Sequence, residues 1–265
     1  MSVVKFMSYV LSGLLLLYLV RPGAAEEGDG RVVKEGMRVT DWWNYPVQGG
    51  ASNQTESSDN DSMCNTGQHQ SPVDIRNTKH THLPPLNFQY RTSILSINRE
   101  GGNLWIDYDS GSYLYIRGKR YKLIGFDFHT PGEHRFNGEA AEMEIHLHHI
   151  DAEGQRLIVA IPVVGGHRNN ITLMRIWENI PNYNSLREYR RIGINPMFLL
   201  PLDRSYALYS GSETKPPCEE DVLWIVFTNP IRVSNRDIGR FHSIVGNNAR
   251  PVQPLNNRVI VQSNP

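Results

Sequence analysis

The chain has 265 residues with 27 basic and 27 acidic side chains, and 39% of the residues are hydrophobic. Domains usually take ~100–200 residues, so the length allows one large domain or two small ones. The balanced charge argues against nucleic acid or an anionic membrane surface as the main partner, and the ordinary apolar content excludes wholesale disorder. Five of the ten histidines fall within 21 residues, namely His129, His134, His146, His148 and His149.

The N-terminal segment has the pattern of an export signal. Lys5 precedes an apolar run over residues 6–20, and small residues follow before the first acidic pair. This pattern predicts a secretory signal over residues 1–25 that is cleaved. An uncleaved signal anchor is the alternative, which Arg21 favours, but the run is short for a membrane span of ~20 residues. The mature chain, 26–265, is expected to be secreted and to lack a membrane span.

Because the chain is expected to be exported, its two cysteines, Cys64 and Cys218, are predicted to form a disulfide. Two free thiols are the alternative, which is unusual outside a reducing compartment. Closing so long a loop is worth ~4–5 kcal/mol in the chain-entropy treatment. Polar residues 47–62 predict a flexible surface loop. Three N-glycosylation sequons begin at Asn53, Asn60 and Asn170.

Short strands separated by turns predominate after Cys64. Alternating or apolar runs predict strands at 104–108, 113–117, 122–129, 141–150, 157–164 and 222–228. Helical periodicity is confined to 171–180 and 235–245. No internal repeat or second linker divides the chain. The sequence therefore predicts a single, mainly β domain of the α+β class with short helices.

Polar side chains of the histidine-rich region fall on common strand faces. Strand alternation places Asp127 and His129 on one face of the first strand. It places Glu144, His146 and His148 on one face of the second. Neighbouring strands of this kind could form a three-ligand zinc site with an open position. A solvated polar strand face is the alternative, and the spacing alone does not decide between them.

Separated motifs carry a wider resemblance. They are QHQSPVDI at 68–75, FHTPGEH at 128–134, EIH at 144–146, TKPPC at 214–218 and NARPVQPLNNR at 248–258. In order and spacing they resemble the α-type carbonic anhydrases over almost all of the mature chain. The resemblance implies a ten-stranded, mostly antiparallel twisted sheet, zinc at the base of a conical cavity, and the same disulfide. The implied reaction is the reversible hydration of carbon dioxide to bicarbonate.

The resemblance also implies roles for single residues. His129 and His146 match the second and third zinc ligands, and Glu144 matches the carboxylate that orients the third. Thr214 and Glu133 match the pair that orients zinc-bound hydroxide. Zinc lowers the pKa of its bound water to ~7, which makes hydroxide available near neutral pH.

The first ligand position departs from the family. Asp127 stands where the family has histidine, and Gly125 replaces the glutamine that supports that ligand. A carboxylate binds zinc at ~2.0–2.2 Å, so a His2Asp site is chemically sound. Its negative charge, however, makes the bound water less acidic.

The carbon dioxide pocket departs as well. His148 and Glu213 replace apolar wall residues, whereas Val222 and Trp224 match the remaining wall. Lys215, beside Thr214, replaces a small residue and is a candidate partner for Glu213. Asn103 falls near the position of the proton-shuttling histidine and cannot titrate near pH 7.

Two functions follow from these departures. The favoured one is a carbonic-anhydrase-related protein with weak or lost hydration that binds an unknown protein partner. The alternative is an active zinc carbonic anhydrase that acts on carbon dioxide and bicarbonate. His148 adds a structural question, because as a fourth ligand it would close the zinc site, whereas unligated it lines the cavity.

Overall fold

The computed structural model describes residues 62–182 and 184–264, which belong to one compact unit. The predicted signal and the sequons at Asn53 and Asn60 lie outside the described residues. Within the described part of the chain, no helix is long and apolar enough to cross a membrane.

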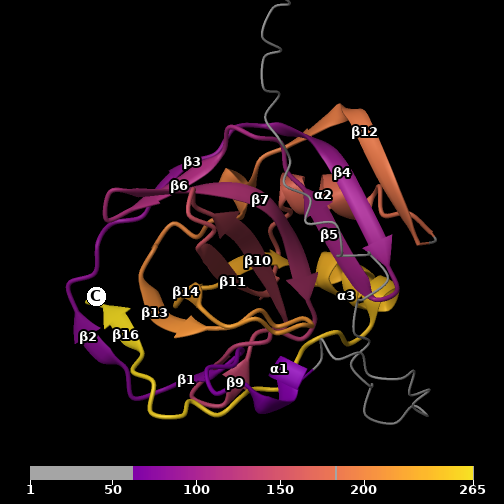
Figure 1. Ribbon diagram of the computed structural model, residues 1–265. Helices are drawn as coiled ribbons and strands as arrows, with labels where there is room; N and C mark the ends of the chain where they lie inside the picture. The colour runs from indigo at the N-terminus through magenta and orange to yellow at the C-terminus, as the bar shows by residue number, and fades with distance from the viewer. Residues whose placement is uncertain (1–61, 183, 265) are drawn as a thin grey trace, which may run out of the picture. The chain divides into compact units, whose positions relative to one another are not determined.

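A 13-stranded sheet dominates this unit, and ten of its strands follow one another along a main path (Figure 1). Across the sheet these are β12 (Ser185–Ile194), β4 (Ser93–Glu100), β5 (Asn103–Asp107), β7 (Lys119–His129), β10 (Met143–Ile150), β11 (Arg156–Gly166), β14 (Val222–Phe227), β13 (Tyr206–Gly211), β16 (Val261–Ser263) and β2 (Lys79–Thr81). Along this path β11–β14 and β16–β2 are parallel and the other pairs antiparallel. The predicted mainly β fold with a mostly antiparallel sheet is therefore confirmed, and the sheet has three strands more than the ten expected.

Smaller elements complete the unit. The strands of the large sheet that lie off the main path are β3 (Asn87–Gln89), β6 (Tyr113–Ile116) and β15 (Ile231–Ser234). A separate, three-stranded sheet consists of β1 (Asp74–Ile75), β8 (Arg135–Phe136) and β9 (Glu139–Ala140). The helices are α1 (Ser62–Thr66), α2 (Ile171–Trp177), α3 (Asn235–Val245) and the 3-10 helix η2 (Pro196–Leu199). Asn170, the third sequon, caps α2, since its side-chain oxygen accepts hydrogen bonds from two backbone amides of the first turn.

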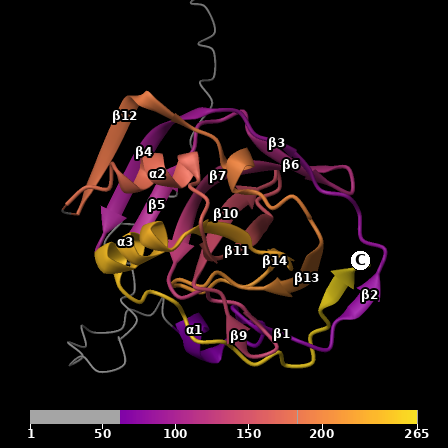
Figure 2. The same cartoon turned by 180° about the vertical axis from the view of Figure 1, so that it is seen from behind.

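Two helices cover one face of the sheet (Figure 2). The ring of Phe128 on β7 lies 4.9 Å from that of Trp177 on α2 and 5.5 Å from that of Phe241 on α3. Because side chains alternate along a strand, the apolar residues of β7 face these helices. Asp127 and His129 therefore face the other side.

Candidate metal centre

The centre is built by two neighbouring antiparallel strands, β7 and β10. Their register pairs Asp127 with His146 and His129 with Glu144. Directly paired residues point to the same face of a sheet, so these side chains share one space. Asp127, His129 and His146 are each 1% exposed. The shared face expected from strand alternation is present, and it is buried rather than solvated.

Two imidazole nitrogens in this space have no hydrogen bond among the described residues. Nε2 of His129 and Nδ1 of His146 are buried and make no hydrogen bond to any described residue. The carboxylate of Asp127 lies 3.6 Å from the first and 3.9 Å from the second. One donor atom from each of the three residues lies within 4.8 Å of the others. Buried unpaired nitrogens that face a carboxylate fit a His2Asp zinc site.

The opposite nitrogens of both rings are fixed by neighbours. Nε2 of His146 lies 2.6 Å from Oε1 of Glu144. Nδ1 of His129 lies 3.1 Å from Oε1 of Glu133 and 3.3 Å from the backbone oxygen of Asn248. These contacts orient each unpaired nitrogen toward Asp127. Asn248 was not predicted in this role, although it opens the motif at 248–258.

Charges in the centre follow from burial and close partners. Burial alone lowers the pKa of His129, but Glu133 and Asp127 outweigh it and raise the pKa to about 10. Burial, together with the neighbouring His129, lowers the pKa of His146. Without a metal, these neighbours favour the protonated form of His129 and the neutral form of His146. A metal ion that binds His129 would compete with that proton.

Lys215 occupies the remaining side of Asp127. Its ammonium forms an ion pair with Oδ2 of Asp127, and the side chain of Lys215 is 15% exposed. Oδ1 of the same carboxylate lies 3.1 Å from Nε2 of His148. Burial alone would raise the pKa of Asp127, but Lys215, His148 and His129 hold it well below its usual range. Both oxygens of the candidate ligand are thus engaged within the protein.

Asp127 is an ion-pair partner of Lys215, and the pairing of Lys215 with Glu213 stays a prediction. Glu213 lies 3.7 Å from Nδ1 of His148 and 3.9 Å from Arg156. Arg156 in turn contacts Glu219 at 2.6 Å. Polar and charged side chains therefore run from Asp127 through His148 and Glu213 to Arg156 and Glu219, along what the resemblance implies is the gas pocket.

His148 lies on the wall of this space and outside the donor set. Its Nε2 bonds to Asp127 and its Nδ1 faces Glu213. The indole of Trp105, which was not predicted as a site residue, packs edge-on against it at 5.0 Å between ring centres. Gly125 makes room for this indole, since a Cβ at that position would collide with the Trp105 ring.

The remaining predicted residues surround the centre. Val222 and Trp224 on β14 are fully buried, and the ring of Trp224 lies 4.9 Å from that of His146. Glu133 is buried, and its Oε1 accepts the backbone N–H of Arg250 at 2.8 Å. Thr214 and Asn103 are buried, on the loop after β13 and at the start of β5 respectively.

The predicted disulfide joins Cys64 of α1 to Cys218, with Cα atoms 5.0 Å apart. Cys218 follows Thr214 and Lys215 closely in the chain, so the bond anchors the loop that carries both.

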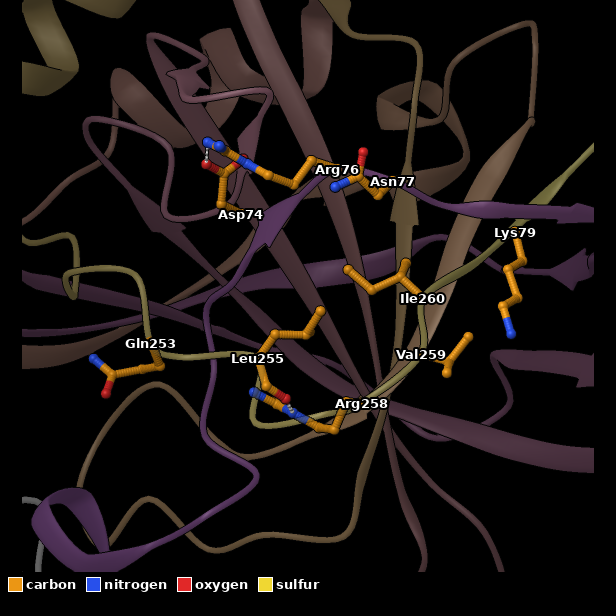
Figure 3. A pocket seen from close by; sticks show the side chains of 9 residues that line it. All are labelled: Asp74, Arg76, Asn77, Lys79, Gln253, Leu255, Arg258, Val259 and Ile260. Atoms are coloured by element: carbon orange, nitrogen blue, oxygen red, sulfur yellow. Dashed lines mark hydrogen bonds and ion pairs between the residues drawn. The ribbon is translucent and has the colours of Figure 1, made fainter.

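A separate cavity of about 430 Å³ opens between β1 and the C-terminal segment (Figure 3). Two of its three lining cations are engaged locally, since Arg76 pairs with Asp74 and Arg258 donates to the backbone oxygen of Leu255 at 2.9 Å. The cavity shares no lining residue with the centre around Asp127.

Comparisons with known proteins agree with this architecture. The family described as eukaryotic-type carbonic anhydrase matches residues 52–264. A carbonic anhydrase from Nostoc sp. (strain PCC 7120) is 33% identical over 227 residues, which covers 83% of this chain and 86% of the relative. Dioscorin DB3L from Dioscorea polystachya is 30% identical over 210 residues, which covers 74% of this chain and 76% of the relative.

Solved structures extend the likeness to the fold. A hyperthermostable carbonic anhydrase identified from an active hydrothermal vent chimney has a TM-score of 0.75 and 35% identity, and the match covers 78% of this chain and 93% of the other. The family match spans most of the chain, and it includes β7, β10 and the loop of Thr214. The chain therefore belongs to the eukaryotic-type, or α, carbonic anhydrase family, whose reaction is the hydration of carbon dioxide.

Proposed function

We propose that this protein is a secreted member of the α-carbonic anhydrase family in which hydration is weak or lost, and that it acts mainly by binding a partner. The observation that carries the proposal is the buried ion pair between Asp127 and Lys215. It engages the carboxylate that stands at the first ligand position.

The donor set supports a reduced rather than an ordinary zinc chemistry. Asp127, His129 and His146 would hold the ion, which when bound supplies hydroxide near neutral pH by lowering the pKa of its water. Asp127 brings a negative charge that a neutral imidazole lacks. That charge offsets part of the metal's effect on the water, so less hydroxide is available at pH 7.

The pocket wall supports the same conclusion. Carbon dioxide is nonpolar, and an apolar wall holds it without competition from water. His148, Glu213 and Arg156 present polar and charged atoms along this wall. Glu213 also places a negative charge where bicarbonate, an anion, would form. Both effects lower turnover, the first for the substrate and the second for the product.

An active His2Asp zinc enzyme is the second candidate. The unpaired nitrogens of His129 and His146 and the supporting carboxylates Glu133 and Glu144 favour it, because a metal would satisfy the unpaired atoms.

A binding role is supported by the range of proteins that share the fold. Dioscorin complexed with ascorbate matches with a TM-score of 0.70 and 30% identity, covering 77% of this chain and 89% of the other. The disulfide supports secretion, because such bonds persist in oxidising compartments.

Zinc content and stopped-flow hydration on the wild type and on Asp127→His test the proposal. We expect little zinc and slow hydration in the wild type, and more of both in the variant. Asp203→His changes an exposed carboxylate that bonds only to Ser205 among the described side chains, so it serves as the matched control. Wild-type hydration at the rate of ordinary family members would overturn the proposal.

A triple change, Asp127→His with His148→Val and Glu213→Leu, separates the metal from the pocket. If the wall also limits turnover, the triple variant hydrates carbon dioxide faster than Asp127→His at equal zinc content. Equal rates would show that the ligand alone accounts for the loss.

A further inference from the structure

We infer that Lys215 is a built-in cation that competes with zinc for Asp127, so that the metal binds only when the ammonium moves away. The inference deepens the proposed function and rests on it, since it concerns the same centre.

Asp127 needs a positively charged partner because its carboxylate is buried. Its side chain is 2% exposed, and a buried carboxylate without a partner is strongly unfavourable. A metal ion would meet this need in an ordinary zinc site. Here Lys215, 88 residues further along the chain, meets it from the loop after β13.

The ammonium of Lys215 lies at the oxygen of Asp127 that faces His129. Lys215 pairs with Oδ2 of Asp127, and Oδ2 is the oxygen that lies 3.6 Å from the unpaired Nε2 of His129. A zinc ion bound by His129 and Asp127 would therefore lie close to the ammonium of Lys215. Two cations this close in a buried space repel each other strongly. Zinc and the ammonium are thus alternatives at this carboxylate.

Replacing the ammonium of Lys215 by zinc at Asp127 requires only the lysine side chain to move. The backbone oxygen of Lys215 accepts the N–H of Cys218 at 2.9 Å, and Cys218 is tied to Cys64. The backbone is therefore held, and the flexible four-carbon stem, whose side chain is 15% exposed, is the part of Lys215 that would move. Glu213 is the nearby carboxylate that would receive the displaced ammonium.

The test measures zinc affinity on the metal-free mature protein by competition with a chromogenic chelator. Lys215→Met should bind zinc roughly tenfold more tightly, or better, than the wild type. Lys215→Arg keeps the cation and should remain as weak as the wild type. Lys119→Met is the matched control, because Lys119 also pairs with an aspartate, Asp151, but at the exposed end of β7.

Two further measurements distinguish competition at Asp127 from a general change in the structure caused by the Lys215 substitution. Bound Co²⁺ should give the visible absorption of a site with histidine ligands at lower metal concentration in Lys215→Met than in the wild type. In an Asp127→Asn background, the same lysine substitution should leave zinc affinity unchanged, because the carboxylate under competition is gone. Should Lys215→Met fold poorly, Lys215→Gln takes its place in every comparison.

The outcomes separate this inference from the proposed function. Equal zinc affinity in the wild type and Lys215→Met overturns the competition, whatever the hydration rate. A fast wild-type enzyme overturns the proposed function, yet tighter zinc binding by Lys215→Met would still support the competition. The competition is also overturned if Lys215→Met raises zinc affinity equally in the Asp127→Asn background, since the lysine would then act through another group.

Discussion

His149 shows how a single position on β10 can acquire a different chemistry from its neighbours. It points to the side opposite His146 and His148, as strand alternation predicts, and it is 1% exposed. Its Nε2 shares a hydrogen bond of 2.7 Å with the hydroxyl of Tyr90. Burial lowers the pKa of His149 to about 3, so this imidazole is neutral in the folded protein.

This neutral imidazole predicts a loss of stability in mild acid. The unfolded chain takes up a proton at His149 below about pH 6.5, whereas the folded chain does so only near pH 3. The unfolded state therefore binds more protons in this window, and the free energy of unfolding falls as the pH falls. By about pH 5 the loss amounts to about 2 kcal/mol. His149→Gln keeps a hydrogen-bonding group without titrating, so its urea unfolding should depend less on pH between 6.5 and 5.

His80→Gln serves as the control, because His80 lies exposed on β2. It should keep the pH dependence of the wild type. If His149→Gln kept it too, the acid sensitivity would belong to other groups.

Two contacts of the centre could not be predicted from the sequence. Comparison of motifs identified Asp127, because the aligned family residue is a histidine. It did not identify the partner of Asp127, since Lys215 lies 88 residues away and Glu213 is the nearer charge in the sequence. The collision that ties Gly125 to Trp105 was equally hidden, because it depends on how β5 lies against β7.

Several elements with an apolar pattern were predicted, whereas the buried strands β4 and β13 were not. The apolar runs identified β7, β10, β11 and β14, and the helix over 235–245 has the bounds of α3. β12 was missed because it is an exposed edge strand in which four of the ten residues are charged. An edge strand buries too little apolar surface to show alternation, and charges on it discourage pairing with other chains.

Asn248 links the segment after α3 to the end of β7. Its side-chain oxygen accepts the N–H of Thr130 at 2.8 Å, and its amide donates to the backbone oxygens of Phe128 and Gly102 at 2.9 and 3.2 Å. Its own backbone oxygen lies beside Nδ1 of His129. The segment therefore holds both the strand end and the ring of a candidate ligand.

Truncating this link should destabilise the protein measurably. In Asn248→Ala, a backbone N–H and two carbonyls lose their side-chain partner, and we expect the free energy of unfolding to fall by about 2–3 kcal/mol. Chemical denaturation measures this change. Asn179→Ala removes one exposed hydrogen bond, to the backbone oxygen of Arg175, and should cost less than about 1 kcal/mol. Similar losses in the two variants would contradict the role of Asn248.

On the scale of the whole described unit, segments distant in sequence converge beneath the centre. Arg250 is buried, and it donates to the side chain of Gln70 and to the backbone oxygens of Ser71 and Cys64. Gln70 in turn donates to the backbone oxygen of Cys218. The disulfide thus lies within a hydrogen-bonded junction of three chain segments.

The junction and the disulfide make separable contributions to stability. The Cys64–Cys218 bond spans 154 residues, and closing a loop of that size in the unfolded chain is worth about 4–5 kcal/mol. The double variant Cys64→Ser/Cys218→Ser should lose about this much in reversible urea unfolding, while the folded junction remains. Wild-type protein in a reducing agent should show the same loss, and the double variant should not respond to the reductant. A double variant as stable as the oxidised wild type would contradict a stabilising role of the bond and leave the junction to the hydrogen bonds of Arg250 alone.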